Sequence, residues 1–135
     1  MSIEKEIIQP DNWQPARGYV NGILVRPGKI LFMAGQVGWD ENEKFQSAEM
    51  GPQFAQALKN ILTLVEKAGG SAEHICRMTC FCKDKDKYIA ARKEIGKAWK
   101  ALLGKNYPVM SMIFISDLLV PGSQIEIEAT AVIPE

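Results

Sequence analysis

The segment QIEIEATAVIPE at residues 124–135 places the strongest constraint on how this chain can fold. One side of it is apolar at every second residue: Ile125, Ile127, Ala129, Ala131 and Ile133. The other side carries Glu126, Glu128, Thr130 and Val132. Alternation with a period of two is typical of a half-buried β-strand. The segment therefore predicts a sheet with one covered face, and it leaves open whether both glutamates are solvated or one points into a site.

Periodicity and turn residues elsewhere in the 135 residues predict a β-β-β-α-β-α-β-β order. We expect strands near 3–8, 18–26, 29–36, 74–82, 107–116 and 125–133, and helices over about 52–68 and 86–103. The stretch VRPGK, centred on Pro27 and Gly28, predicts a turn. The order predicts one α+β two-layer domain over residues 1–135, with a mixed sheet and two helices on one face. Because two helices cover only one face, we expect a second subunit to cover the other.

Composition excludes several classes of protein. Sixteen Lys and Arg balance sixteen Asp and Glu, which argues against a nucleic-acid binder that works by charge neutralisation. The N-terminal stretch lacks a basic region followed by an apolar one, so we expect no secretory signal. No apolar run reaches the length of a membrane span. Three cysteines within seven residues indicate free thiols rather than a disulfide framework. We expect a cytoplasmic protein.

His74, Cys76, Cys80 and Cys82 have the residue types of a zinc site. All four share one parity, so a single strand would present them on one face. Residues two apart on a strand are about 6.5–7 Å apart, whereas tetrahedral zinc holds every ligand about 2.0–2.3 Å from one centre. One straight strand cannot close such a site. We therefore predict no metal and no cofactor, and interpret the thiols as small buried packing groups.

Arg92 breaks the pattern of the second predicted helix. The apolar stripe of that helix is formed by Tyr88, Ala91, Ile95, Trp99 and Leu102. At about 100° per residue, Arg92 falls within the stripe. Its stem can pack while its head reaches water. Alternatively, its guanidinium can stand at the wall of a pocket and bind an anion. The sequence leaves both interpretations open.

Six stretches, in this order and spacing, resemble the Rid family (also called YjgF or L-PSP), the reactive-intermediate deaminases. They are GYVNG at 18–22, ILFMAGQVG at 30–38, ALKNILTLVEKAGG at 57–70, HICRMTCFCKD at 74–84, YPVM at 107–110 and IEIEATAV at 125–132. The resemblance implies a fold similar to the trimeric bacterial chorismate mutase, with ligand clefts between subunits. It also implies hydrolysis of short-lived enamines and imines, such as 2-aminoacrylate, to a 2-keto acid and ammonia.

The resemblance implies site residues one by one. Tyr19 matches the cleft tyrosine of the family, Gly35 matches the glycine whose backbone faces the ligand, and Gln36 follows it. Glu126 matches the acid that positions the attacking water, which would leave Glu128 structural.

Two positions depart from the family pattern. Met110 stands where active deaminases carry the arginine that grips the substrate carboxylate, and Ala34 replaces a common serine. Arg92 aligns with a cleft asparagine. The positive charge that the family carries on the strand, at the position of Met110, would thus lie on the second helix in this chain, at Arg92. Trp39 could form part of the pocket wall, or it could be a packing residue without a role in the site.

Two functions of different classes follow. The first is a deaminase that hydrolyses an enamine or imine with an acidic group in a homotrimer cleft, and that acts poorly on 2-aminoacrylate because Met110 cannot hold a carboxylate. A substrate larger than 2-aminoacrylate is compatible with the resemblance. The second is a non-enzymatic trimer that binds a small metabolite or another protein. Loss of the arginine favours the second function, whereas retention of Glu126 and Tyr19 favours the first.

Overall fold

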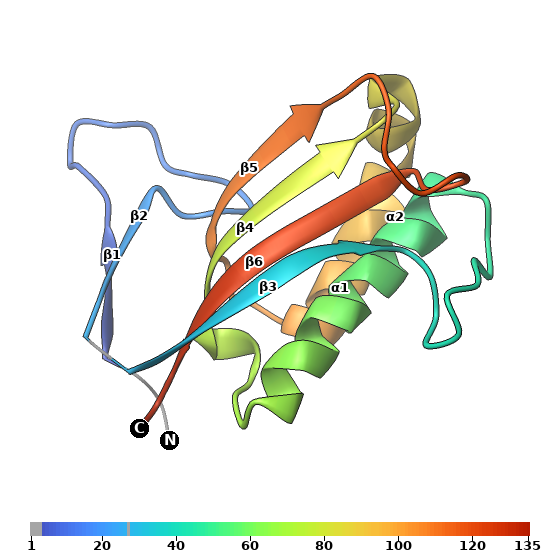
Figure 1. Ribbon diagram of the computed structural model, residues 1–135. Helices are drawn as coiled ribbons and strands as arrows, with labels where there is room; N and C mark the ends of the chain where they lie inside the picture. Colours follow the sequence, from blue (N-terminus) through green and yellow to red (C-terminus); the bar gives the residue numbers. More distant parts are fainter. Residues whose placement is uncertain (1–3, 27) are drawn as a thin grey trace.

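The computed structural model describes residues 4–26 and 28–135 and has two layers, a sheet backed by two helices (Figure 1). The strands are β1 (Lys5–Ile8), β2 (Gly22–Val25), β3 (Lys29–Val37), β4 (Ile75–Cys82), β5 (Val109–Phe114) and β6 (Ile125–Ile133). The helices are α1 (Met50–Lys67), the short 3-10 helix η1 (Ala72–His74) and α2 (Lys85–Leu103). Both long helices lie on the same side of the sheet. The predicted α+β class is therefore confirmed.

The main sheet has four strands in the order β3–β6–β4–β5. Strand β6 runs antiparallel to both of its neighbours, and β4 and β5 run parallel to each other. Parallel neighbours need a long crossover, which α2 supplies between them. The sheet is mixed, as the sequence predicts. The residues of β6 that alternate inward are buried under the helices, so the covered face is the one that the apolar pattern of 125–133 indicates.

Helix α1 covers most of the apolar face of the four-stranded sheet. Its buried residues follow helical spacing and include Phe54, Ala57, Leu58, Ile61 and Val65. The helix starts without a side-chain cap from Glu49 and without an acidic residue in its first turn. The carboxylate of Glu94 on α2 instead lies against Gly51, in the space that a Cβ there would occupy. A negative group at this end complements the helix dipole and joins the two helices.

Helix α2 has conventional ends. The side chain of Asp84 accepts a hydrogen bond from the Lys87 backbone N–H at 3.0 Å, which caps the N-terminus. Gly104 ends the helix with a φ of 64°, a left-handed conformation that glycine adopts readily. Both helices begin and end within two residues of the predicted bounds. No helix in the described ranges is long and apolar enough to span a bilayer.

The predicted strand over 18–26 is wrong in extent. Strand β2 covers only Gly22–Val25 and pairs with β1 in a separate two-stranded sheet. Gly18, at the start of the predicted range, has a φ of 76°, which keeps this residue out of an extended strand. Val20 then makes an isolated parallel bridge to Val109 at the edge of the main sheet. Pro27, at the centre of the predicted turn, lies outside the described residues.

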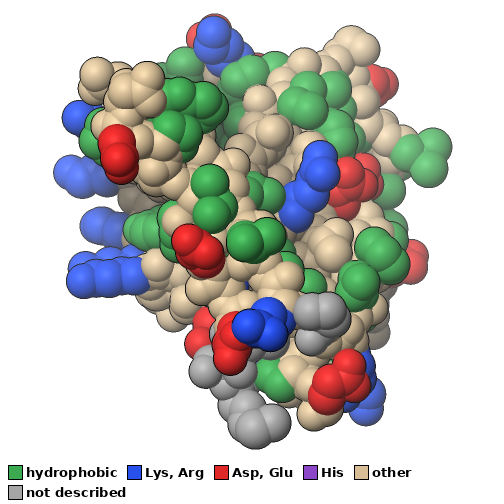
Figure 2. Space-filling view, turned by 90° about the vertical axis from the view of Figure 1, so that its left-hand side faces the viewer, with side chains coloured by type: hydrophobic (Ala, Val, Ile, Leu, Met, Phe, Trp, Pro, Cys, Tyr) green, Lys and Arg blue, Asp and Glu red, His purple; other side chains and the backbone are tan. Residues whose placement is uncertain are grey.

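The hairpin of β1 and β2 leaves apolar side chains exposed. Ile7, Ile8 and Leu24 are 48%, 42% and 62% exposed. Figure 2, which looks onto the side where the hairpin lies, shows hydrophobic side chains scattered among charged ones. The exposed apolar surface is thus broken into small areas here, which is ordinary for a protein surface.

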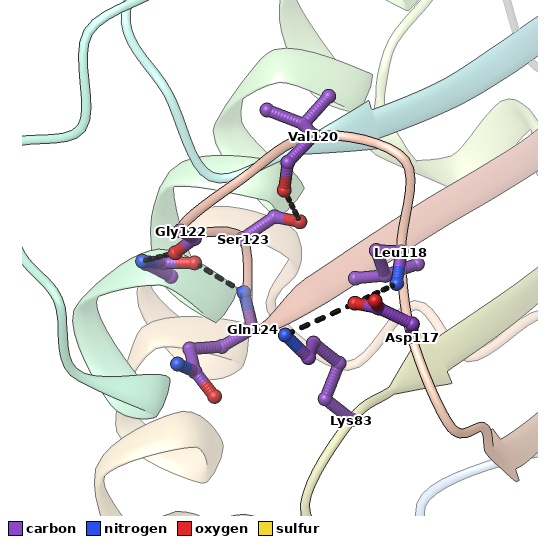
Figure 3. A network of polar contacts seen from close by, with 8 residues as sticks. Lys83, Asp117, Leu118, Val120, Gly122, Ser123 and Gln124 are labelled. Carbon is purple, nitrogen blue, oxygen red and sulfur yellow. Dashed lines mark hydrogen bonds and ion pairs between the residues drawn. The ribbon is translucent and has the colours of Figure 1, made fainter.

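Gln53 ties the first turn of α1 to the loop that leads into β6. Its side chain is 1% exposed. Its Nε2 donates to the carbonyls of Ser47 and Gly122 at 2.9 and 3.0 Å, and its Oε1 accepts from the Gln124 backbone N–H at 2.7 Å. Figure 3 shows the part of this network at Gly122 and Gln124, beside the ion pair of Lys83 with Asp117. The helix therefore fixes where β6 begins.

Replacing Gln53 with leucine tests this anchor. The change leaves three backbone groups without the buried side chain that they bond, in hydrogen bonds that are only partly buried. Water can replace part of each lost bond, so we expect Gln53→Leu to lower the free energy of unfolding in urea by about 1–3 kcal/mol in total. Gln56→Leu is the matched control, since that side chain makes one hydrogen bond, to Asn60. Equal losses in both variants would contradict the role of Gln53.

Candidate functional site

Glu126 and Gly35 meet on the face of the sheet that the helices leave uncovered. Glu126 alternates with buried Ile125 and Ile127, so its partly buried side chain points away from the helices. Gly35 lies on the neighbouring strand β3. A Cβ on Gly35 would lie 2.7 Å from Glu126 Cδ and 2.9 Å from its Oε2. The glycine therefore leaves the space that this carboxylate occupies, and its exposed backbone lies beside the acid.

A bulge in β3 produces this arrangement. The pairing of β3 with β6 shifts between Met33 and Gln36, where Met33 faces Ala129 and Gln36 faces Ile127. Two residues, Ala34 and Gly35, therefore lie opposite Glu128. The side chain of Gln36 turns back and donates to the Ala34 carbonyl at 3.1 Å. Gln36 thus supports the bulge in the single chain.

Arg92 and Met110 line one cavity between α2 and β5. The cavity has a volume of about 210 Å³. Met110 packs against the core from the helix side of the sheet. Arg92 is exposed, and it makes no ion pair within the part of the chain that the structure describes. Its positive charge opposes the burial that raises the pKa of Tyr88. A cation therefore stands beside this cavity, although the strand supplies none at position 110.

Tyr19 lies in a second hollow that also reaches Met110. This hollow of about 260 Å³ is lined in addition by Asn21, Arg77 and Ser111. It forms where Val20 bridges to Val109 and where the Val20 N–H donates to the Pro108 carbonyl at 3.2 Å. Met110 thus connects the surroundings of Tyr19 with those of Arg92. Sequence reasoning assigned no role to Arg77 or Ser111, although the alternation of β4 and β5 places both opposite the helix side.

Glu126 and Arg92 lie on opposite sides of the sheet. Glu126 belongs to the uncovered face, whereas Arg92 is on α2 and lines a cavity on the helix side. Within one chain, the structure therefore groups Glu126 with Gly35, and Arg92 with Met110, as two separate sets. The predicted order, with two helices on one face and Glu126 pointing away from the apolar side of its strand, already implies this division within one chain.

The thiols and His74 do not form the single row that their parity predicts. His74 belongs to η1, and its Nδ1 accepts from the Ser71 backbone N–H at 2.9 Å. The register of β4 against β6 shifts between Ile75 and Arg77, which turns Cys76 away from the row. Burial raises the pKa of Cys80, and that of Cys82 to about 12. The thiolate, which is the metal-binding form, is therefore disfavoured at both positions.

The structure also places Trp39, Glu128 and Tyr107. The ring of Trp39 packs against that of Phe45 in a tilted arrangement, with centroids 5.8 Å apart, and Trp39 belongs to neither cavity described above. Glu128 is exposed on the uncovered face. Tyr107, which sequence reasoning used only as part of the YPVM stretch, lines the Arg92 cavity and stacks on Trp99. Its place just before β5, the strand of Met110, is the signal that could have found it.

A mixed sheet backed by two helices, with a carboxylate against a glycine backbone on its open face, defines a small two-layer α+β domain. The sequence model described as Endoribonuclease L-PSP matches residues 10–133. The chain belongs to this family, which is the Rid or YjgF family that the sequence resembles.

Relatives of known sequence or structure match nearly the whole chain. A RutC family protein of Pasteurella multocida is 30% identical over 128 residues, which cover 94% of this chain and 97% of that protein. A protein of the conserved Rid family from Yersinia pestis has a TM-score of 0.82 at 25% identity, covering 96% and 98% of the two chains. A RidA structure from an Antarctic Psychrobacter has a TM-score of 0.67 at 25% identity, covering 95% and 99%.

A double-mutant cycle tests the contact between Gly35 and Glu126. In Gly35→Ala, the new Cβ displaces the flexible end of Glu126, at a cost of about 0.5–1.5 kcal/mol for a strained side chain. In the Glu126→Ala background, the same change meets no carboxylate and carries no such cost. We expect a coupling of that size between the two sites in urea unfolding. Additive effects would show that the two groups do not touch.

Proposed function

We propose that this protein is a Rid-type enamine or imine deaminase that acts on a small acidic metabolite in clefts between the subunits of a homotrimer. Membership of the family supports the reaction class. The observation that carries the proposal is the contact of Glu126 with Gly35, because it combines a carboxylate and an accessible backbone on one open surface. The ligand would lie over Gly35, with Tyr19 and Gln36 shaping the cleft.

The chemistry needs little more than a held substrate and a positioned water. Water adds to the carbon of the protonated C=N bond while the Glu126 carboxylate accepts its proton. The proton then passes to the nitrogen of the resulting carbinolamine. As the C–N bond breaks, the carbinolamine hydroxyl gives its proton back to the Glu126 carboxylate, the carbonyl forms, and ammonia leaves and takes up that proton as ammonium. Glu126 would therefore act as a base, then as an acid and again as a base, with no cofactor in any step.

Division of the site over the two faces of the sheet supports a cleft between subunits. Glu126 of one subunit can meet Arg92 and Met110 only across an interface, because the sheet separates them within one chain. The uncovered face also exposes Ile30 at 60% and Phe32 at 78%. Burial of such side chains between subunits would be favourable by about 25 cal/mol per Å² of apolar surface. These features fit a trimer packed through its sheets.

In this proposal, Arg92 binds the substrate anion in place of the arginine that is missing at position 110. A charge-assisted hydrogen bond contributes about 1.5–3 kcal/mol, and methionine offers none at position 110. The guanidinium reaches the cavity from α2 rather than from β5, and Met110 offers the carboxylate no partner. A compact acid such as 2-aminoacrylate would thus be held poorly.

A binding protein without catalysis is the second candidate. The observation that favours it is Met110, whose thioether packs against the core and cannot hold a carboxylate. RNA cleavage, which the name of the matching family model suggests, is not part of the proposal. The chain has equal numbers of basic and acidic residues, and a site for a polyanion normally shows a concentration of basic charge.

Assembly can be tested independently of any ligand. We expect light scattering at micromolar concentration to give the mass of three chains, since two helices cover only one face of the sheet. Replacing Phe32 with glutamate places a charge on the uncovered face and should shift the mass toward that of one chain. A monomer mass for the unaltered protein would contradict both the trimer and the shared site.

Activity can be tested by generating imines in situ with an amino-acid oxidase or a dehydratase and following their hydrolysis. We expect a low rate with 2-aminoacrylate. For an imine that the protein accepts, Glu126→Gln should lower turnover by 10²-fold or more, about the size of general base catalysis, and leave binding nearly unchanged. Arg92→Ala should mainly weaken binding, by roughly tenfold.

Glu128→Gln is the matched control for Glu126→Gln, because it removes an exposed charge two residues further along the same face of the strand. It should leave turnover unaltered. Equal turnover in Glu126→Gln and the unaltered protein would rule out the deaminase mechanism and favour the binding protein. Unchanged ligand affinity in Arg92→Ala would return Arg92 to the role of a solvated side chain.

A further inference from the structure

Gly96 has no structural explanation in the packing of α2. It lies in the interior of a helix that runs from Lys85 to Leu103, and glycine is among the poorest helix formers. A Cβ at Gly96 would meet nothing within 4 Å, so no neighbour requires its absence. Nor is Gly96 among the residues with positive φ. The glycine therefore keeps open space beside the helix.

That space belongs to the cavity that holds Arg92. Gly96 follows Arg92 by four residues, which places both on the same face of α2. Gly96, Arg92 and Met110 all line the cavity of about 210 Å³. A side chain at position 96 would project beside the guanidinium and reduce the volume next to it. The missing side chain thus extends the cavity along the helix, away from the charge.

Aromatic rings form the rest of the wall. Trp99 and Tyr107 are stacked, with centroids 6.0 Å apart and an interplanar angle of 11°. Tyr88 is held in place by the rings of Phe54 and Phe114, at 6.2 and 5.7 Å. Ring faces and edges prefer another flat, polarisable group as a partner. The thioether of Met110 adapts to such a group and makes favourable contacts with rings.

Charge and volume define what this cavity can take. Arg92 is the only charged side chain among its lining residues, and it is exposed to incoming ligand. An engineered protein cavity of about 150 Å³ is large enough to bind benzene. The volume here can accommodate one six-membered ring and a short acidic arm. A small acid without a ring would contact Arg92 and leave the aromatic wall empty.

We infer that the cavity selects acids whose carboxylate is joined to a planar aromatic or conjugated group, and that Gly96 is the residue that determines this preference. The carboxylate binds Arg92, and the planar group lies over Gly96 against Trp99 and Tyr107. Met110 makes an apolar contact at the position on β5 where the family pattern has an arginine. This inference rests on the proposed function for the reaction that follows binding, but the preference for a ring belongs to binding itself.

Two acids that differ only by a ring test the inference: 3-phenylpropanoate and propanoate. Calorimetric titration of the full-length protein should give at least tenfold tighter binding of 3-phenylpropanoate. Gly96→Leu should abolish this difference by filling the cavity, while improving the helix propensity of α2. Ala90→Leu, at an exposed position of the same helix outside the cavity, should preserve it. Arg92→Met should weaken both acids by a similar factor.

Equal affinity of the unaltered protein for the two acids would overturn the inference. So would a preference that survives Gly96→Leu, or the absence of detectable binding of 3-phenylpropanoate at millimolar concentration. Thermal unfolding of Gly96→Leu, expected at or above the temperature of the unaltered protein, separates a filled cavity from a misfolded chain. If the ring preference holds but Glu126→Gln does not alter turnover, the deaminase proposal fails and the specificity of the cavity stands.

Discussion

Packing of α1 over the inner face of β6 is the interaction on which the rest of this structure depends. The helix buries Leu58, Ile61 and Val65 against the apolar side of the strand. Two polar residues of the same helix then hold the loops around the candidate site. Gln53 fixes the approach to β6, and Asn60 donates to the carbonyls of Val37 and Trp39 at 3.1 and 2.8 Å. One helix therefore fixes the positions of β3 and β6, the two strands that bring Gly35 and Glu126 together.

The parts of the fold that could be read from the sequence are those that repeat. The alternation at 125–133 and the helical stripe of α1 each involve many residues, so one irregular position does not hide them. The errors fall where a single residue breaks a pattern. Gly18, with its left-handed backbone, lies at the start of an expected strand that begins only at Gly22 in the structure, and a shift of register after Ile75 removes Cys76 from the predicted row of thiols.

The candidate site shows the same limit at the level of topology. Alternation alone predicts that Glu126 points away from the apolar side of its strand, and helical periodicity alone predicts that Arg92 faces the interior. Because both helices are predicted to lie on one face, the two patterns together place Arg92 and Glu126 on opposite sides of the sheet, as the structure shows. The patterns do not give the strand order β3–β6–β4–β5, a set of long-range contacts that decides which side chains line each cavity. For the same reason, the role inferred for Gly96 could not be read from its position in a helical pattern.

The position of β6 in the sheet has a consequence for how the chain reaches its native state. This strand follows every other element in the sequence, yet it lies between β3 and β4 in the middle of the sheet. Strand β3 has no other partner in the four-stranded sheet, so it stays unpaired until residues 125–133 are present. During synthesis, helices and the parallel pair can form early, but the core closes only when these residues leave the ribosome. Loss of this last segment would remove the middle of the protein rather than its edge.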